Sequence, residues 1–298
     1  MSGDVFPLMP GESASSFVLR LANFLTVKPD RFLKKVLGDE RNLAWAIHRR
    51  DRVELLSDFS GLDPDVLDRA FARRPDGLAG ERALLDFTLA ERHLDQTVRR
   101  VSPFVLAQDV AAARSPYHRL IWSVRDVHRD PETGSPLISA CDHCGRILTW
   151  ENCVDPGSCG RCGRPLWRTT PPDKPIAQLD LFICDLFSPH PAVRSARRSR
   201  LAPPLSGWPE GDLLDLMHAL RRVQRLFPTV QPNSDVIEPV VIETHSSISG
   251  LLNRPMSEAA RSGPGTAVTV AAAATTAALR TAPPLVAEFL KTLLMSRT

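Results

Sequence analysis

Apolar residues recur at helical spacing near the start of the chain. Over residues 13–25 one helical face carries Phe17, Val18, Leu21, Phe24 and Leu25. Serines at the front of this stretch can accept hydrogen bonds from the N–H groups of the first turn, so a helix is predicted to begin there. A shorter helical pattern follows and ends at Gly38. It turns four apolar residues inward: Phe32, Leu33, Val36 and Leu37.

A second pair of helices is predicted over residues 52–74. The first helix ends at a turn containing Gly61, and the second begins with Asp63 as N-cap and Pro64 at its first position. This is the order of a helix-turn-helix, whose second helix can read DNA. However, Asp65 and Asp68 join Asp63 beside the arginines of that helix, and acids repel a phosphate backbone. A protein-contacting or structural role is therefore favoured.

The second half of the chain is also predicted to be helical. Residues 177–187 and 212–227 show amphipathic patterns, and a leucine-rich helix is expected at 285–295. Prolines cluster after residue 170 and suggest segments joined by stiff connectors. We therefore expect a mainly α fold in three parts: an N-terminal helix-turn-helix domain at 1–100, a small zinc-ribbon region at 101–170 and a helical C-terminal region at 171–298. The fold of the residues after about 230 stays open.

Composition narrows the class of protein. Hydrophobic content of 43% and charged content of 24% are typical of a soluble globular chain. No apolar run reaches membrane-spanning length and the first residues lack a signal-peptide pattern, so we expect a cytoplasmic protein without membrane contact. Because the net charge is only +3, any binding of nucleic acid must depend on local clusters of cations.

Two Cys-x-x-Cys pairs are the strongest chemical signal. They are Cys141/Cys144 and Cys159/Cys162, fourteen residues apart, and a glycine follows each pair. Two such turns placed face to face offer four thiolates to one structural Zn²⁺ and leave no open coordination position. A disulfide-bonded or reduced loop is the alternative, although a reducing compartment favours a metal. Cys184 is expected to be a buried apolar residue, and whether Cys153 contributes to the metal site stays open.

Two clusters of cations are candidates for contact with phosphate. The denser cluster has four arginines within seven residues and no acid: Arg194, Arg197, Arg198 and Arg200. The other lies on the outer face of the short helix before Gly38: Arg31, Lys34 and Lys35. Both are predicted to bind nucleic acid, because cationic side chains suit phosphate oxygens. A solvated loop or helix face is the alternative for each cluster.

The order of these features resembles a known family. Eight residues near the N-terminus match the opening of TniQ transposition proteins: Pro10, Gly11, Glu12, Ser13, Ser16, Arg20, Leu21 and Ala22. Residues 116–122 resemble the segment that this family places between two clusters of zinc ligands. The cysteine-containing stretch then resembles the family's second zinc knuckle, and the resemblance covers residues 5–170.

The same resemblance indicates a lost metal site. Where the family carries an earlier set of ligands, Ser102 and Val105 stand in place of two cysteines, and Asp130 and Thr133 stand in place of a cysteine and a histidine. An incomplete set of ligands binds zinc poorly, so we expect one zinc ion instead of two. Apolar packing around Phe104 and Val105 is expected to replace the missing metal.

What the resemblance implies is a target-selection adaptor. Proteins of this family act beside a transposase and an AAA+ ATPase, and they link a DNA site, or an RNA-guided effector complex bound there, to the ATPase. The implied partners are the ATPase, DNA and such an effector, with the transposase contacted indirectly. Which site or effector is recognised stays open, as does the oligomeric state; a homodimer is compatible with the sequence.

Two other kinds of protein are alternatives to the adaptor interpretation. A zinc-containing helix-turn-helix transcriptional regulator would bind its operator tightly by itself, usually as a symmetric dimer. A zinc-dependent enzyme would need an open metal position for water, which four cysteines do not leave. No Walker loop, acidic transposase triad or supported Ser-His-Asp arrangement occurs. We therefore assign no catalytic residue and do not expect an enzyme.

Overall fold

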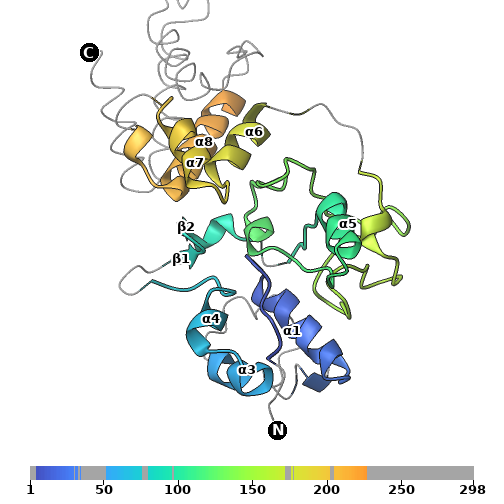
Figure 1. Cartoon of the computed structure of the whole chain (residues 1–298). Helices are drawn as coiled ribbons and strands as arrows, with labels where there is room; N and C mark the ends of the chain where they lie inside the picture. The colour runs from blue at the N-terminus through green and yellow to red at the C-terminus, as the bar shows by residue number, and fades with distance from the viewer. Residues whose placement is uncertain are drawn as a thin grey trace, which may run out of the picture. The chain divides into compact units, whose positions relative to one another are not determined.

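A computed structural model describes residues 5–29, 31–32, 34, 52–75, 80–95, 97–171, 176, 178–201 and 205–226. The chain divides into two compact units, Met1–Pro189 and His190–Thr298. Figure 1 labels the helices and strands of the described residues. The described residues are mainly helical, as expected, with one two-stranded sheet. The predicted division at residues 100 and 170 stays a prediction, and the helix expected at 285–295 lies outside the described residues.

The first helix begins where the serines predict. Helix α1 (Ala14–Phe24) is capped by Ser13, whose side chain accepts a hydrogen bond from the backbone N–H of Ser16 at 3.3 Å. Its inward face is buried, with one correction. Phe24 is 54% exposed, because the helix ends there and the ring lies at the surface against Phe6, with ring centroids 5.0 Å apart. Of the next predicted helix, Phe32 is described and is buried.

The second helical pair is shorter than the sequence indicates. Helix α3 (Val53–Ser60) ends at Gly61 with φ 74°, a conformation that suits glycine. Helix α4 (Pro64–Asp68) begins with Asp63 as N-cap, as predicted, but has only five residues. The chain then extends, and the backbone of Arg73 pairs with that of Ala83. The expected recognition helix is therefore about 8 Å long, too short to follow a DNA groove.

A β-hairpin follows that the sequence reading did not include. Strands β1 (Glu81–Leu84) and β2 (Phe87–Ala90) are antiparallel, with Glu81 opposite Ala90 and Leu84 opposite Phe87. Leu84 and Leu89 are fully buried, and the Phe87 ring meets the Phe187 ring edge-on at 5.1 Å. This contact joins the hairpin to the C-terminal end of α6 (Gln178–Leu186), which lies in the same unit.

The rest of the first unit consists of short elements. The 3₁₀ turn η3 (Glu91–His93) precedes helix α5 (Pro103–Ala111), which is capped by Ser102. The 3₁₀ turns η4 (Leu120–Ser123) and η5 (Leu166–Arg168) follow it. The core of this unit includes the completely buried Trp122 and the buried faces of α1, α3 and α4. Trp150 and Cys153, from the cysteine-containing region, also pack into the core around α1.

The described part of the second unit is helical. It contains α7 (Pro191–Arg198), a 3₁₀ turn η6 (Leu205–Gly207) and α8 (Glu210–Leu226). The amphipathic helix predicted at 212–227 is confirmed as α8, with Leu213, Leu216 and Met217 buried. The arginine-rich segment forms a helix, so the alternative of a solvated loop is wrong in its local structure.

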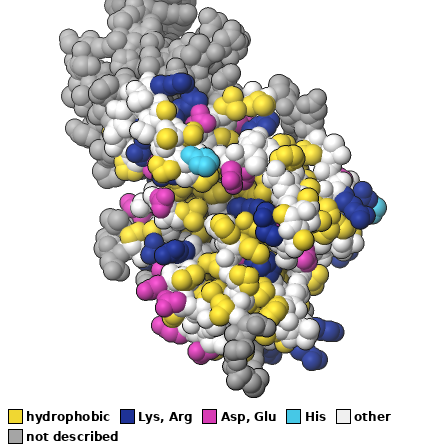
Figure 2. All heavy atoms as spheres, viewed as in Figure 1, with side chains coloured by type: hydrophobic (Ala, Val, Ile, Leu, Met, Phe, Trp, Pro, Cys, Tyr) yellow, Lys and Arg dark blue, Asp and Glu magenta, His cyan; other side chains and the backbone are white. Residues whose placement is uncertain are grey.

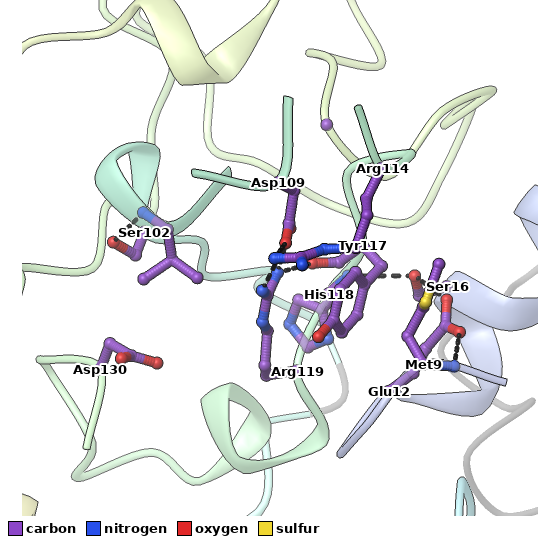
Figure 3. A network of polar contacts seen from close by, with 12 residues as sticks. Met9, Glu12, Ser16, Ser102, Asp109, Arg114, Tyr117, His118, Arg119 and Asp130 are labelled. Atoms are coloured by element: carbon purple, nitrogen blue, oxygen red, sulfur yellow. Dashed lines mark hydrogen bonds and ion pairs between the residues drawn. The ribbon is translucent and has the colours of Figure 1, made fainter. Parts of the chain in front are cut away.

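A buried ion pair anchors the start of α1. Glu12 and Arg20 are 1% and 5% exposed, and Arg20 Nη1 lies 2.5 Å from Glu12 Oε2. The same carboxylate accepts hydrogen bonds from the Ser16 hydroxyl at 2.7 Å and from the Met9 N–H at 3.1 Å (Figure 3). Three donors hydrogen-bond the Glu12 carboxylate. These bonds offset part of the free energy that is needed to remove its charge from water.

The segment at residues 117–120, here called the seam segment, joins α1 to α5. On one side, the N–H of His118 donates to Ser16 Oγ at 3.0 Å, and its Nδ1 lies 3.0 Å from Ser13 Oγ. On the other side, Arg119 binds the fully buried Asp109 of α5 through both Nη atoms, at 2.5 and 2.9 Å (Figure 3). Neighbouring residues of an extended chain point in opposite directions, so one short segment can bind both helices.

The buried carboxyl group of Glu12 gives a pH-dependent stability. Burial raises its pKa from 4.5 to about 7, although Arg20 and the hydrogen bonds oppose this rise. As pH rises from 4.5 to 7, the unfolded chain releases this proton before the folded chain does. The contribution of Glu12 to the free energy of unfolding is therefore present at low pH and is lost as pH rises through this window, by about 3 kcal/mol at most.

The variant Glu12→Gln should lack this dependence. We expect the free energy of unfolding of the wild type, minus that of E12Q, to fall between about pH 5 and about pH 8. Urea unfolding followed by tryptophan fluorescence measures it, and other titrating groups cancel in the difference. A difference that stays constant across this range would mean that Glu12 is ionised throughout, with Arg20 outweighing burial.

Candidate metal centre

The two Cys-x-x-Cys turns are built alike. In each turn the N–H of the glycine donates to the carbonyl of the first cysteine at 2.9 Å, and the N–H of that cysteine donates to the carbonyl of the following arginine at 2.9 Å. The glycines, Gly145 and Gly163, have φ of 67° and 71°. Since a left-handed conformation strains residues with a Cβ, glycine suits these positions. The predicted knuckles are thus two copies of one turn.

The repeat is longer than the sequence reading recognised. Each copy reads Cys-x-x-Cys-Gly-Arg-x-Leu, and the two leucines, Leu148 and Leu166, are fully buried. Backbone bridges join Ala140 to Ile147 in the first copy and Ser158 to Pro165 in the second. The leucines attach each turn to the core, and this signal was present in the sequence at a spacing of 18 residues.

The four sulfurs meet at one place with the geometry of a zinc site. Sγ of Cys141 lies 3.8 Å from Sγ of Cys162, and Sγ of Cys144 lies 3.8 Å from Sγ of Cys159. All four sulfurs lie within 4.8 Å of one another. With Zn–S bonds of about 2.3 Å, the sulfurs of a regular tetrahedron are about 3.8 Å apart, whereas a disulfide would need about 2.05 Å. The residues fit a closed tetrahedral Zn²⁺ site.

Burial and backbone hydrogen bonds have opposite effects on the pKa of the first cysteine in each copy. Burial raises the pKa of the Cys141 thiol to about 11. Burial also opposes ionisation of Cys159, but hydrogen bonds from the backbone N–H groups of Cys162 and Arg161 outweigh it and lower the pKa to about 7. In both knuckles, N–H groups of the turn hydrogen-bond the first cysteine and favour its thiolate, against the effect of burial on the pKa.

Cys153 lies outside this cluster. Its sulfur accepts a hydrogen bond from Nη1 of the buried Arg99 at 2.9 Å and lies 3.3 Å from the Asp155 carbonyl oxygen. The Arg99 guanidinium also binds the carbonyls of Pro156 and Ser158, at 3.0 and 2.7 Å. Arg99 therefore holds the loop between the knuckles against the core, and Cys153 belongs to that contact.

The loop between the knuckles also fits closely against its neighbours. A Cβ at Gly157 would lie 2.7 Å from the Cβ of Pro116, which directly precedes the seam segment. Nδ2 of Asn23, near the end of α1, donates to the carbonyl of Val154 at 2.9 Å. The cysteine-containing region is thus attached to both α1 and the chain leading into the seam segment.

The positions of the expected lost metal site are joined by hydrogen bonds. Ser102 Oγ lies 2.6 Å from Ser135 Oγ, which lies 2.7 Å from Thr133 Oγ1. Thr133 in turn donates to Asp130 Oδ1 at 2.9 Å, and the other Asp130 oxygen accepts from Trp122 Nε1 at 2.8 Å. This chain of contacts supports the interpretation that the frame of a metal site is kept and closed by hydrogen bonds.

The packing predicted around that frame is only half right. Val105 is buried as expected, but Phe104 is 53% exposed and lies on the outer face of α5. The reason is the helical turn. Ser102 caps α5, whose inward face carries the buried Val105, Leu106 and Asp109, and Phe104 falls on the opposite face of the helix. Polar contacts through Ser135, which were not predicted from the sequence, join the frame where packing of Phe104 was expected.

The predicted nucleic-acid residues lie in both units. In the first, Arg31 and Lys34 are exposed, and Lys35 lies outside the described residues. In the second, Arg194, Arg197 and Arg198 belong to α7, and Arg200 follows its end. On the face drawn in Figure 2, hydrophobic side chains are interspersed with charges of both signs. Among the described helices, none is both long and apolar enough to cross a membrane.

The comparison with protein families decides the relationship. Residues 5–129 match the model of the TniQ family. The chain carries a TniQ domain. This match confirms the resemblance seen at Gly11–Glu12–Ser13. It covers α1, α3, α4, the hairpin, α5 and the seam segment, and it ends before the four cysteines. A comparison with curated proteins finds no match.

Metal content tests the site of the TniQ-containing chain. We expect one zinc ion per purified chain, because one set of four thiols is complete and the Ser102–Asp130 frame offers no such set. Cys144→Ser should lose most of the zinc and open residues 141–163 to protease. The control Cys184→Ala, in α6, should keep one zinc. Elemental analysis with limited proteolysis measures both.

Two outcomes would contradict this assignment. Two zinc ions per chain would mean that a second group of ligands, in addition to the four cysteines, binds metal. Full zinc content in Cys144→Ser would mean that the ion lies elsewhere.

Removing zinc with a chelator should also expose Trp150 to water and shift its fluorescence to the red, while most helical circular dichroism remains.

Proposed function

We propose that the chain is a transposition target-selection adaptor. In this proposal it binds a target DNA site, or an RNA-guided effector complex at that site, and recruits an AAA+ ATPase. The chain contacts the transposase only indirectly, through the ATPase. The match of residues 5–129 to the TniQ family carries the proposal. The structure supplies a suitable platform, since buried contacts hold α1, α5 and the seam segment in one arrangement.

The proposal assigns no bond-making chemistry to the chain. The four cysteines would use all coordination positions of a zinc ion, so none is open for water. His118 is buried, and burial, with Arg99, Arg100 and Arg119 nearby, lowers its pKa well below the usual range. Glu12 and Asp109 are buried against arginines. These groups support the packing of the domain, which agrees with a protein that acts by binding.

Nucleic acid is proposed to contact the two cation clusters. Arg31 and Lys34 are exposed on the first unit, and α7 with the residue pair that follows it carries four arginines. Residues 191–200 contain no acid and Glu210 of α8 pairs with Arg198, so the four arginines keep a net positive charge toward a phosphate backbone.

The short helix α4 favours the adaptor over a transcriptional regulator. A regulator would read bases with this helix, but it has five residues, and Asp65 lies in its first turn. Arg73, expected on the helix, lies beyond it and pairs with Asp68 at 3.2 Å. A surface of this kind suits contact with a protein or a structural role better than contact with DNA.

Co-purification tests the adaptor. We expect the tagged chain to retain an AAA+ ATPase encoded beside it through size-exclusion chromatography, and to ignore an unrelated AAA+ ATPase used as control. We also expect a duplex from the target site and a scrambled duplex to bind with similar affinity. A regulator predicts the reverse: no ATPase in the complex and a preference of about 10³-fold or more for one sequence.

A further inference from the structure

A hollow of about 440 Å³ opens on the second unit, beside α7. Its lining includes two arginines, three serines and one glutamate: Arg194, Arg198, Ser195, Ser199, Ser206 and Glu210. We infer that this hollow is a pocket for one phosphate group of a nucleic-acid backbone. The inference rests on the proposed contact of the chain with nucleic acid, and it assigns that contact to particular arginines.

The helix sorts its arginines into two groups. Residues three, four and seven positions apart share a face of a helix, and Pro191, Arg194, Ser195 and Arg198 are so spaced. All four line the hollow, whereas Arg197 and Arg200 are not part of its lining. The cluster that looks uniform in the sequence thus has a pocket pair, Arg194 and Arg198, and an outer pair, Arg197 and Arg200.

Glu210 fixes one arginine without saturating it. Arg198 Nη2 lies 2.7 Å from Glu210 Oε1, and the side chain of Glu210 is only 11% exposed. The buried Nε of Arg198 has no hydrogen-bond partner. The ion pair therefore holds the guanidinium of Arg198 at the wall of the hollow, where it keeps its positive charge.

The charge of the pocket selects the kind of phosphate. Two arginines and one glutamate give a net charge of +1, and three hydroxyls add uncharged donors. A backbone phosphodiester carries one negative charge, whereas a phosphate monoester carries about −1.5 to −2 at neutral pH. The pocket thus balances a diester and leaves a monoester with uncompensated charge beside Glu210.

Paired variants test the pocket. Wild type, R194Q/R198Q and R197Q/R200Q are titrated with a fluorescein-labelled DNA duplex of mixed sequence at several salt concentrations. Both double variants remove two positive charges from residues 191–200. We expect the pocket variant to bind about tenfold more weakly, with a salt slope lower by about one. We expect the outer-pair variant to lose less affinity, about threefold, because Arg197 and Arg200 then contribute only to the general positive field around the hollow.

Two single variants keep the test sound if R194Q/R198Q folds poorly. R194Q leaves the Arg198–Glu210 pair intact and should still weaken binding, with an unchanged circular dichroism spectrum. E210Q removes a carboxylate from the pocket and should strengthen binding by about threefold, because Arg198 then faces the phosphate alone. A purely structural role of the pair predicts weaker binding in E210Q.

Three results would overturn the inference. Equal losses in the two double variants would show that the arginines act as a general field, with no pocket. Inorganic phosphate could stabilise the wild type but not R194Q, while R194Q binds DNA as well as the wild type. This combination would assign the pocket to a free phosphate. Absence of DNA binding by the wild type would remove the nucleic-acid contact altogether. Recruitment of the ATPase is measured separately, so the adaptor function could fail or stand independently.

Discussion

His118 and Arg119 are neighbours in the chain, yet they hold opposite sides of the TniQ domain. His118 binds the serines at the start of α1, and Arg119 binds Asp109 in α5. Both contacts depend on the extended backbone between them. A shift of one residue would turn the imidazole toward the carboxylate and the guanidinium toward the serines, and both sets of contacts would be lost. The register of residues 117–120 therefore fixes how α1 and α5 are arranged.

These contacts are polar and buried, which has an energetic meaning. Desolvation offsets most of the attraction in a buried ion pair, so such pairs add little net stability, while removal of one partner costs about 3–5 kcal/mol. In this domain the Asp109–Arg119 pair includes a residue of the seam segment, and the Glu12–Arg20 pair lies next to that segment. Their main consequence is that alternative packings leave a buried charge unpaired. The arrangement of the helices is thereby made unique.

Local signals in the sequence were enough to predict the features that depend on local chemistry. Ser13 and Asp63 cap the helices expected of them, and the cysteine pairs meet with metal-site spacing. The misses depend on distant residues. Helix α4 ends early because the chain leaves it to pair Arg73 with Ala83, and the hairpin is stabilised through Phe187, about a hundred residues away. The hollow beside α7 likewise needs Glu210 of α8, which no pattern in residues 190–200 announces.

The hydrogen-bonded frame around Ser102 and Asp130 and the four-cysteine site belong to one unit, but they differ in their sensitivity to oxidants and to zinc supply. Thiolates are oxidised and depend on a supply of zinc, whereas hydroxyl groups and a carboxylate are inert to both. Oxidative stress or zinc starvation would therefore act first on residues 141–163, through Trp150 and Cys153 against α1. The junction of α5 with Trp122 would keep its structure under the same conditions. Among the described residues, α1 would thus respond to oxidants and to zinc supply through its contact with Trp150 and Cys153.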